Sequence, residues 1–443
     1  AVFSLPVLAD TPSKRDERTL DPIEVTGEAV KKAASPKFTA PLLDTPQTLS
    51  VIPSDVYLSQ GAQNLTDVLR NTPGISFSAG ENAFATGTSN FSMRGFDTSG
   101  SIFVDGARDS GNYSRDVFNL EQVEVAKGPA ADYGRGGLAG YVNMVTKTPQ
   151  IDNDFVRGTA SIGADQYDSS ARLRSTFDIN QQVGESSALR LNLLVQNGGV
   201  AGRDHATADA LGIAPTLALG LGGDTQVTFG VQHLKQDNRP DWGVPGAFLP
   251  DTINYNAVAG SAERDRFYGL ASDVDETGST TAFARIEHAF GNGATLRNQT
   301  RWSENDRSAA FTVPFGYNAA TTQVTGQTQF YRRDNSAISN QTDLSFGFST
   351  GALQHQLAAG LEFSREEADA LRYGTTTPAP ADVLSPDPNR PSPAWPAPTQ
   401  SASVKIDTLA AFIYDTVEFG ERWQLTGGLR AESYEVELGS HVL

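Results

Sequence analysis

The sequence predicts a mainly β protein in which a compact N-terminal α+β domain precedes a transmembrane antiparallel β-barrel. After Pro149 the chain consists of long stretches in which apolar and polar residues alternate, and their connections alternate between short and long. Short turns at one end and long loops at the other are typical of outer-membrane barrels, whereas a soluble sandwich has no reason to sort its loops by length. The absence of any run of 18 apolar residues excludes a spanning helix but not a barrel, whose strands are only half apolar.

Composition excludes several classes of site and partner. The 443 residues contain no cysteine, which excludes disulfides, cysteine–zinc sites, iron–sulfur clusters and cysteine nucleophiles. A net charge of −18 argues against a nucleic-acid partner. The chain shows no Gly-x-Ser-x-Gly elbow and no distinctive pair of acidic residues, so we predict no enzyme and no catalytic residue. Its histidines are scattered without metal-ligand spacing, so we expect no metal site and no cofactor: His205, His233, His288, His355 and His441.

The first 42 residues read as two segments without a packed core. Residues 1–9 (AVFSLPVLA) resemble the end of a secretory signal peptide, with a frayed apolar terminus as the alternative. Residues 10–42 are polar, charged and punctuated by proline, which predicts a flexible tether. Within that tether, Ile23-Glu24-Val25-Thr26 is a short β-prone stretch.

Residues 43–149 have the texture of a folded α+β domain. Apolar clusters at 49–52, 102–104, 123–125 and 141–145 are separated by turn signals such as Asp105-Gly106. Residues 64–70 predict a short helix that ends before Pro73.

Residues 150–443 supply the predicted barrel strands. The alternation is clearest at 171–179, 189–196, 353–364 and 423–432. Short connections are expected at 220–224, 291–293, 350–352 and 419–422, and long loops at 236–278, 304–337 and 366–401. We count about eleven strands, whereas single-chain bacterial barrels have even numbers, so we expect that roughly half of a barrel is missing.

Two further groups of residues suggest sites. Gly134, Gly136 and Ala139 match the spacing of a dinucleotide fingerprint, but β-prone residues rather than a helix follow, so tight turns are the better interpretation. Arg108, Tyr113 and Arg115 lie near glycine turns, a combination that suits an anionic aromatic ligand through charge and stacking. Solvated or salt-bridged arginines are the alternative.

Several motifs taken together resemble the plug domain of TonB-dependent outer-membrane receptors. They are residues 45–53 (TPQTLSVIP), 65–74 (LTDVLRNTPG), 93–96 (MRGF), 104–106 (VDG) and 123–149, in the order and spacing of the family. Residues 238–245 (NRPDWGVP) are similar to a barrel segment of catecholate-type ferric-siderophore receptors.

The resemblance implies a plug, residues 43–149, inside a 22-stranded barrel, of which residues 150–443 would form the N-terminal half. It implies a monomer in the outer membrane of a Gram-negative bacterium, surrounded by lipid, which imports a ferric siderophore with energy from TonB, ExbB and ExbD. Ile23, Glu24, Val25 and Thr26 match the TonB box, an extended peptide suited to strand addition. Iron would arrive caged by the siderophore.

Candidate ligand residues are Arg108, Tyr113 and Arg115 in the plug, and Arg239 and Trp242 in the barrel. For residues 239–242 the alternative is a loop-folding motif with an internal Arg–Asp pair. Three other functions stay open: a different cargo (haem, cobalamin or a glycan), a passive porin-like channel, and a secondary role as a phage or bacteriocin docking surface. The loops that select the cargo vary most.

Overall fold

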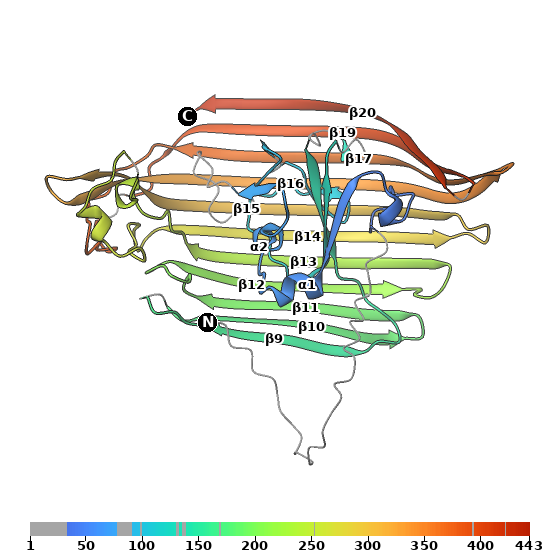
Figure 1. Ribbon diagram of the computed structural model, residues 1–443, viewed down its shortest axis with the longest axis horizontal. Coiled ribbons are helices and arrows are strands. Elements are labelled where there is room, and N and C mark those ends of the chain that lie inside the picture. The colour runs from blue at the N-terminus through green and yellow to red at the C-terminus, as the bar shows by residue number, and fades with distance from the viewer. Residues whose placement is uncertain are drawn as a thin grey trace, which may run out of the picture.

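The computed structural model describes residues 33–77, 91–97, 100–129, 133–134, 139–167, 170–251, 253–391, 394–420 and 422–443. A broad curved sheet forms most of the molecule, and the N-terminal domain lies against the middle of one face (Figure 1). Within the described residues, no helix is long and apolar enough to cross a membrane.

The N-terminal domain is built on a five-stranded sheet of order β1-β7-β8-β5-β6. Its strands are β1 (Thr48–Pro53), β5 (Ile102–Val104), β6 (Ala107–Arg108), β7 (Leu120–Lys127) and β8 (Gly140–Thr146). A small second sheet comprises β2 (Ile75–Phe77), β3 (Phe91–Met93) and β4 (Phe96–Asp97). The predicted apolar clusters thus become the strands that build the core, with Val123, Val125 and Val142 fully buried.

Two short helices, α1 (Ser54–Ser59) and α2 (Leu65–Leu69), pack on this core. The helix predicted at 64–70 is confirmed as α2. Its N-cap is Asn64, whose side-chain oxygen accepts a hydrogen bond from the backbone N–H of Asp67 at 3.0 Å. The helix buries Leu65, Val68 and Leu69. The buried apolar face and the N-cap therefore both place the helix at residues 65–69.

The large sheet is an antiparallel meander in which each strand pairs with its neighbour in the chain, apart from the small β18 (Ala381–Asp382), which pairs with β16. Among the described residues this sheet has eleven main strands, which confirms the number predicted. They are β9 (Phe155–Gly163), β10 (Arg172–Gly184), β11 (Ser187–Gly198), β12 (Thr207–Leu219), β13 (Thr225–Arg239), β14 (Val274–Ala289), β15 (Thr295–Asn318), β16 (Gln323–Thr350), β17 (Leu353–Tyr373), β19 (Pro398–Phe419) and β20 (Trp423–Val442). Among the described residues, β9 and β20 are its edges, and the sheet is open between them.

The pattern of burial on this sheet is the reverse of that in a soluble protein: its apolar side chains are exposed and its polar side chains are buried. Apolar side chains such as Leu173 (47% exposed) and Leu429 (77% exposed) point away from the N-terminal domain. Polar side chains on the other face are buried, as shown by Arg174 (7% exposed) and Arg190 (3% exposed). An apolar outer face suits lipid, and the strand alternation predicted from the sequence is confirmed.

The prediction of a long loop at 304–337 is wrong. β15 and β16 continue through it as a hairpin, and only residues 319–322 connect them. The stretch is rich in polar residues on both faces, which the alternation rule reads as a loop. Its backbone nevertheless stays extended, because every residue from Asn305 to Pro314 pairs with the neighbouring strand.

The loops expected at 236–278 and 366–401 are also shorter than predicted, because the flanking strands extend into them. These connections carry the 3-10 helices η3 (Gly246–Phe248) and η4 (Ala259–Ser261), and η1 (Leu42–Asp44) lies in the N-terminal segment. The long connections pack on one another: the Tyr268 hydroxyl donates to the carbonyl of Val383 at 2.5 Å, and Arg390 donates to the carbonyl of Tyr268 at 2.6 Å.

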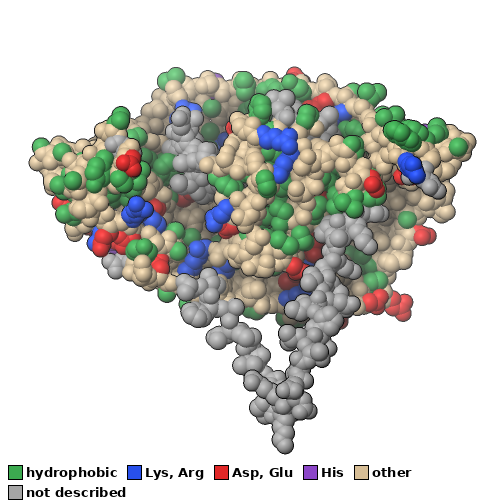
Figure 2. All heavy atoms as spheres, viewed as in Figure 1, with side chains coloured by type: hydrophobic (Ala, Val, Ile, Leu, Met, Phe, Trp, Pro, Cys, Tyr) green, Lys and Arg blue, Asp and Glu red, His purple; other side chains and the backbone are tan. Residues whose placement is uncertain are grey.

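Polar contacts hold the N-terminal domain against the sheet, whose middle it covers in the space-filling view (Figure 2). The backbone N–H of Asn112 donates to Asn305 at 2.9 Å, and Lys147 donates to Asn192 at 3.0 Å. Apolar contacts contribute as well, since Phe118 of this domain packs with Leu194 and Leu234 of the sheet. The interface therefore combines hydrogen bonds and charges with an apolar patch.

Gly140 provides a test of the N-terminal core. It begins β8 at a φ of +128°, and a Cβ there would overlap the carbonyl oxygen of Ala126 on β7. We expect Gly140→Ala to lower the free energy of unfolding of this domain by about 1–3 kcal/mol, as measured by denaturant unfolding in detergent and by protease digestion. Gly100→Ala is the matched control, because a Cβ added at Gly100 would meet no atom within 4 Å among the residues that the structure describes. Equal stability of the two variants would contradict this assignment.

Candidate ligand-binding site

Tyr113 and Arg115 lie together in a buried knot around Asp109. The Arg115 Nε donates to Asp109 Oδ2 at 2.8 Å, and the Tyr113 hydroxyl donates to the same oxygen at 2.9 Å. The guanidinium also lies 4.7 Å from the centroid of the Tyr113 ring and donates to the carbonyl of Gly111 at 2.7 Å. Arg115 is 4% exposed and Tyr113 is 7% exposed. Both side chains therefore stabilise the conformation of the loop between β6 and β7. Direct ligand contact by either residue stays a prediction.

The electrostatics of the knot depend on the ion pair. Burial by itself would raise the pKa of Asp109, but the adjacent Arg115 guanidinium overcomes this effect and lowers that pKa below its ordinary value. Burial also opposes the charge on Arg115, yet Asp109 raises the pKa of Arg115. Both groups are therefore charged at neutral pH, and each requires the other.

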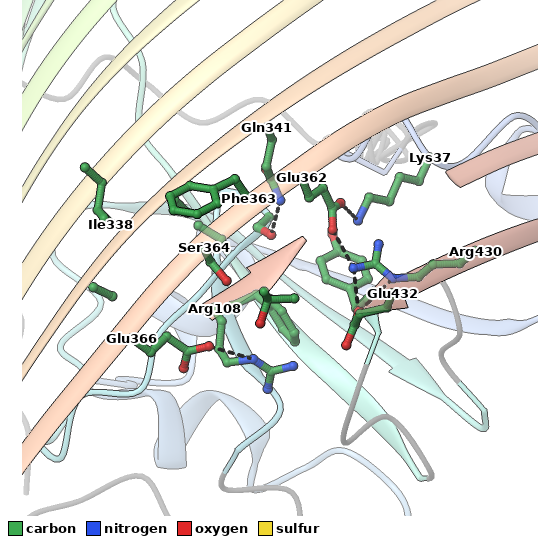
Figure 3. Close-up of a pocket in the computed structure, with 17 residues that line it drawn as sticks. Lys37, Arg108, Ile338, Gln341, Glu362, Phe363, Ser364, Glu366, Arg430 and Glu432 are labelled. Atoms are coloured by element: carbon green, nitrogen blue, oxygen red, sulfur yellow. Dashed lines mark hydrogen bonds and ion pairs between the residues drawn. The ribbon is translucent and has the colours of Figure 1, made fainter. Parts of the chain in front are cut away.

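Arg108 points in another direction, towards β17 of the sheet (Figure 3). Its guanidinium lies 4.8 Å from the centroid of the Phe103 ring and 3.9 Å from Glu366 Oε1. It lines a small cavity of about 60 Å³ between β6 and β17. The structure therefore separates Arg108 from the pair that the sequence places beside it.

A network of charges closes the other side of this cavity. Lys37 lies 2.5 Å from Glu362, and Arg430 lies 2.7 Å from Glu362 and 2.8 Å from Glu432 (Figure 3). The Lys37 ammonium also lies 4.3 Å from the centroid of the Tyr133 ring. Lys37, near the end of the stretch predicted as a tether (residues 10–42), is thus held at strand β17, and Glu362 links it to Arg430 of β20.

Sequence reasoning missed these wall residues. Glu362 falls on the polar face of the stretch 353–364, and Arg430 falls on the polar face of 423–432. A charged residue in the middle of an alternating strand was the available signal, because such a side chain faces the lumen and needs a partner there.

Arg239 and Trp242 lie at the end of the sheet with the long connections and are held apart. Arg239 lines a cavity of about 450 Å³ between α2 and strands β10 to β14. Its guanidinium donates to the carbonyls of His205 at 3.1 Å and Ala271 at 3.2 Å. Trp242 instead stacks on Phe311, with ring centroids 4.8 Å apart.

The alternative of an internal pair between Arg239 and Asp241 is wrong, because Asp241 has a different arginine as its partner. Asp241 pairs with Arg203, from the connection between β11 and β12, with Arg203 Nε 2.6 Å from Asp241 Oδ2. Arg239 is spaced two residues from Asp241, but its side chain is directed to backbone carbonyls. The ligand roles of Arg239 and Trp242 stay predictions.

Ile23, Glu24, Val25 and Thr26 lie outside the described residues. The described chain begins at Ala33, at the end of the sheet that carries the short turns. Residues 33–41 line a cavity of about 560 Å³ there, with Gly293 and Gly347 on its wall. Within the described ranges, no group of three His, Asp or Glu side chains is placed to hold a metal ion.

Comparison with known families agrees with this architecture. Residues 41–141 match the TonB-dependent receptor plug domain, and residues 212–442 match the TonB-dependent receptor-like β-barrel, which is more than half of the chain. The chain belongs to the TonB-dependent receptor family. The N-terminal domain is therefore the plug, the large sheet is barrel wall, and the protein resides in the outer membrane of Gram-negative bacteria.

Known receptors give the same picture. The chain is 36% identical to the catecholate siderophore receptor Fiu of Escherichia coli K12, over 93% of this chain and 56% of Fiu. It is 37% identical to the probable TonB-dependent receptor BfrD of Bordetella pertussis, over 98% of this chain and 61% of BfrD. The crystal structure of Fiu in its closed form superposes with a TM-score of 0.86 at 35% identity, covering 93% of this chain and 60% of that one. The chain thus spans between half and two thirds of the length of these relatives, which are receptors.

The Asp109–Arg115 pair generates a prediction on pH dependence. Because the pKa of Asp109 is lowered in the folded plug, the pair's stabilisation is fully present above the unfolded pKa and is lost as the pH falls through the folded pKa. Arg115→Gln leaves a buried carboxylate alone, at an expected cost of about 3–5 kcal/mol at neutral pH. In that variant burial dominates and raises the pKa of Asp109, so the stability gap to the wild type should narrow from pH 7 to pH 4.5.

Denaturant unfolding of the plug in detergent at several pH values measures this gap. The double variant Asp109→Asn/Arg115→Gln lacks the titrating carboxyl and is the control, since its gap should stay constant over the same range. A gap in Arg115→Gln that does not change with pH would contradict the assigned ion pair.

Proposed function

We propose that the receptor to which this chain belongs binds a ferric siderophore at the outer face and imports it into the periplasm with energy from the inner membrane. The observation that carries the proposal is the plug, which a set of buried ion pairs and hydrogen bonds ties to the wall. Arg174–Asp116 and Arg301–Asp105 each join the plug to a barrel strand, and Lys37–Glu362 joins the segment just before the plug to β17. A lumen filled in this way argues against a passive porin, because a solute passes only after these contacts separate.

A catecholate-type siderophore is the proposed cargo. The support is the 36% identity to a receptor named for catecholate siderophores. Iron then belongs to the substrate, and the protein needs no cofactor and no catalytic residue. Haem, cobalamin and glycans are alternative cargoes, and growth of a receptor-deficient strain on a panel of ferric siderophores separates them.

The proposed partner is TonB, acting with ExbB and ExbD on residues 23–26, in a receptor that is monomeric among outer-membrane lipids and has no nucleic-acid partner. An extended, β-prone peptide suits capture by strand addition. The placement of residues 33–41 at the short-turn end supports this proposal, since short turns face the periplasm in outer-membrane barrels.

Deletion of residues 23–26 tests energy coupling. We expect uptake of iron to be abolished while binding of the ferric siderophore to whole cells is unchanged, because the deletion removes the coupling peptide and leaves the outer site intact. Uptake by radioiron accumulation and binding on de-energised cells give the two readouts. Uptake that persists after the deletion would favour the porin.

Substitution of Arg108 and of Arg115 distinguishes a residue that contacts the ligand from one that stabilises the plug. Arg108→Ala should weaken siderophore binding about tenfold, since it removes one cation from an anion site at a cost of about 1.4 kcal/mol, without loosening the plug. Arg115→Ala should weaken binding and also raise the protease sensitivity of the plug. Arg365→Ala, on the outer face of β17, is the control. Unchanged affinity would remove the substituted residue from the site.

A further inference from the structure

Three arginines of the barrel wall face the plug on two adjacent strands. Arg285 lies on β14, and Arg297 and Arg301 lie on β15. The register places Arg297 opposite Glu287 and Arg285 opposite Gln299, so the side chains form one diagonal patch. Their side chains are 16%, 13% and 10% exposed respectively, which puts the patch on the covered face of the sheet.

Arg285 and Arg297 share one carboxylate at poor geometry. Arg285 Nε lies 3.3 Å from Glu287 Oε2, and Arg297 Nε lies 4.0 Å from Glu287 Oε1. The Glu287 side chain is 37% exposed, so it is partly solvated. Among the described residues, neither buried Nε atom has a hydrogen-bond partner.

Other arginines of the same wall form forked pairs with a carboxylate. Arg190 binds Asp178 through two bonds of 2.8 Å, and Arg307 binds Asp275 through bonds of 2.8 and 2.7 Å. Such forked pairs are what a purely structural luminal arginine forms. Arg297 also donates to Gln299 Oε1 at 3.1 Å through Nη2. Because the Nε atoms of Arg285 and Arg297 form no hydrogen bond among the described residues, these two arginines have capacity left for a further anion.

The plug places a carboxylate at the edge of this patch. Asp105, at the tip of the β5–β6 hairpin, lies 3.6 Å from Arg301. Gln299 donates to the carbonyl of Asp105 at 3.1 Å, and Gln341 donates to the carbonyl of Gly106 at 2.9 Å. The tip is thus docked on β15 and β16 by side chains of the wall.

The free space in the lumen narrows at these arginines. A cavity of about 40 Å³ separates the hairpin tip from Arg285 and Arg297. Arg297 and Asp343 line both this cavity and the cavity of about 560 Å³ at the short-turn end. The small cavity is far below the roughly 300–1,000 Å³ typical of ligand pockets, so cargo reaches the arginines only when the tip has moved.

We propose that Arg285, Arg297 and Arg301 form a transit site for the anionic ferric catecholate, which Asp105 guards in the resting receptor and which the cargo occupies after the plug tip withdraws. The inference rests on the proposed function. Iron(III) held by three catecholate dianions carries three negative charges and presents aromatic faces, and guanidinium groups bind both through charge and stacking. The facing carboxylate of Asp343 limits the affinity, as passage requires binding weak enough for release.

The test uses the receptor expressed from its complete gene in cells without other ferric-catecholate receptors, with radiolabelled iron(III) tris(catecholate) as the probe. In Arg285→Gln/Arg297→Gln we expect binding to de-energised cells within twofold of the wild type and energised import reduced about tenfold per receptor. Arg285→Lys/Arg297→Lys keeps the charge and should retain more import than the glutamine pair. Arg365→Gln is the matched control outside the lumen.

The outcomes separate this inference from the function on which it rests. Wild-type import together with wild-type binding in the glutamine pair would overturn the transit site. An equal loss of import in the lysine and glutamine pairs would also overturn it, because the positive charge would not matter. If the glutamine pair does not reach the membrane, the single variant Arg285→Gln replaces it, with an expected loss of about threefold. A wild-type receptor that neither binds nor imports the probe would instead contradict the proposed function.

Discussion

A charge buried between the plug and the barrel wall must be paired there, and the rest of the structure follows this constraint. Burial of an unpaired ion is costly, so luminal arginines are joined to carboxylates on the plug, on the wall or on both. Arg174 on β10 reaches Asp116 of the plug with two bonds of 2.8 Å, and Lys37 reaches Glu362 on β17. These pairs set the position of the plug more strictly than an apolar core would, because charge-assisted bonds depend on direction as well as distance.

The same constraint bears on the passage of the proposed cargo through a plugged lumen. A polar interface exchanges its internal partners for water or for an anionic ligand at a smaller cost than an apolar core, which has to be exposed. Apolar contacts build the core of the plug, around Val123, Val125 and Val142, and a smaller apolar patch joins Phe118 of the plug to Leu194 and Leu234 of the wall. The interface between plug and wall therefore combines charged pairs with this patch, and Lys37, which lies before the plug, forms one of those pairs.

The predicted and the observed sites differ in which charged residues lie together. The sequence groups Arg108, Tyr113 and Arg115 because they are neighbours in the chain, but Arg108 is directed to Glu366 on β17 whereas Arg115 is turned inwards to Asp109. Asp241 likewise finds Arg203 from another connection in place of the nearby Arg239. Ion-pair partners are chosen by proximity in space, and in a meander of eleven strands spatial neighbours come from distant parts of the chain.

The sequence by itself determined the elements of this protein. Periodicity of two indicates about eleven wall strands, the stretch 64–70 before Pro73 predicts the helix observed as α2, and the order of plug motifs indicates the family. Only the tertiary structure decided where β15 and β16 end, which charges pair, and that Arg285 and Arg297 share one acid. The physical reason is the distance over which each property acts. Periodicity and turn signals are local properties of a few residues, whereas strand continuation and charge pairing depend on what the neighbouring strand and the plug place opposite each residue.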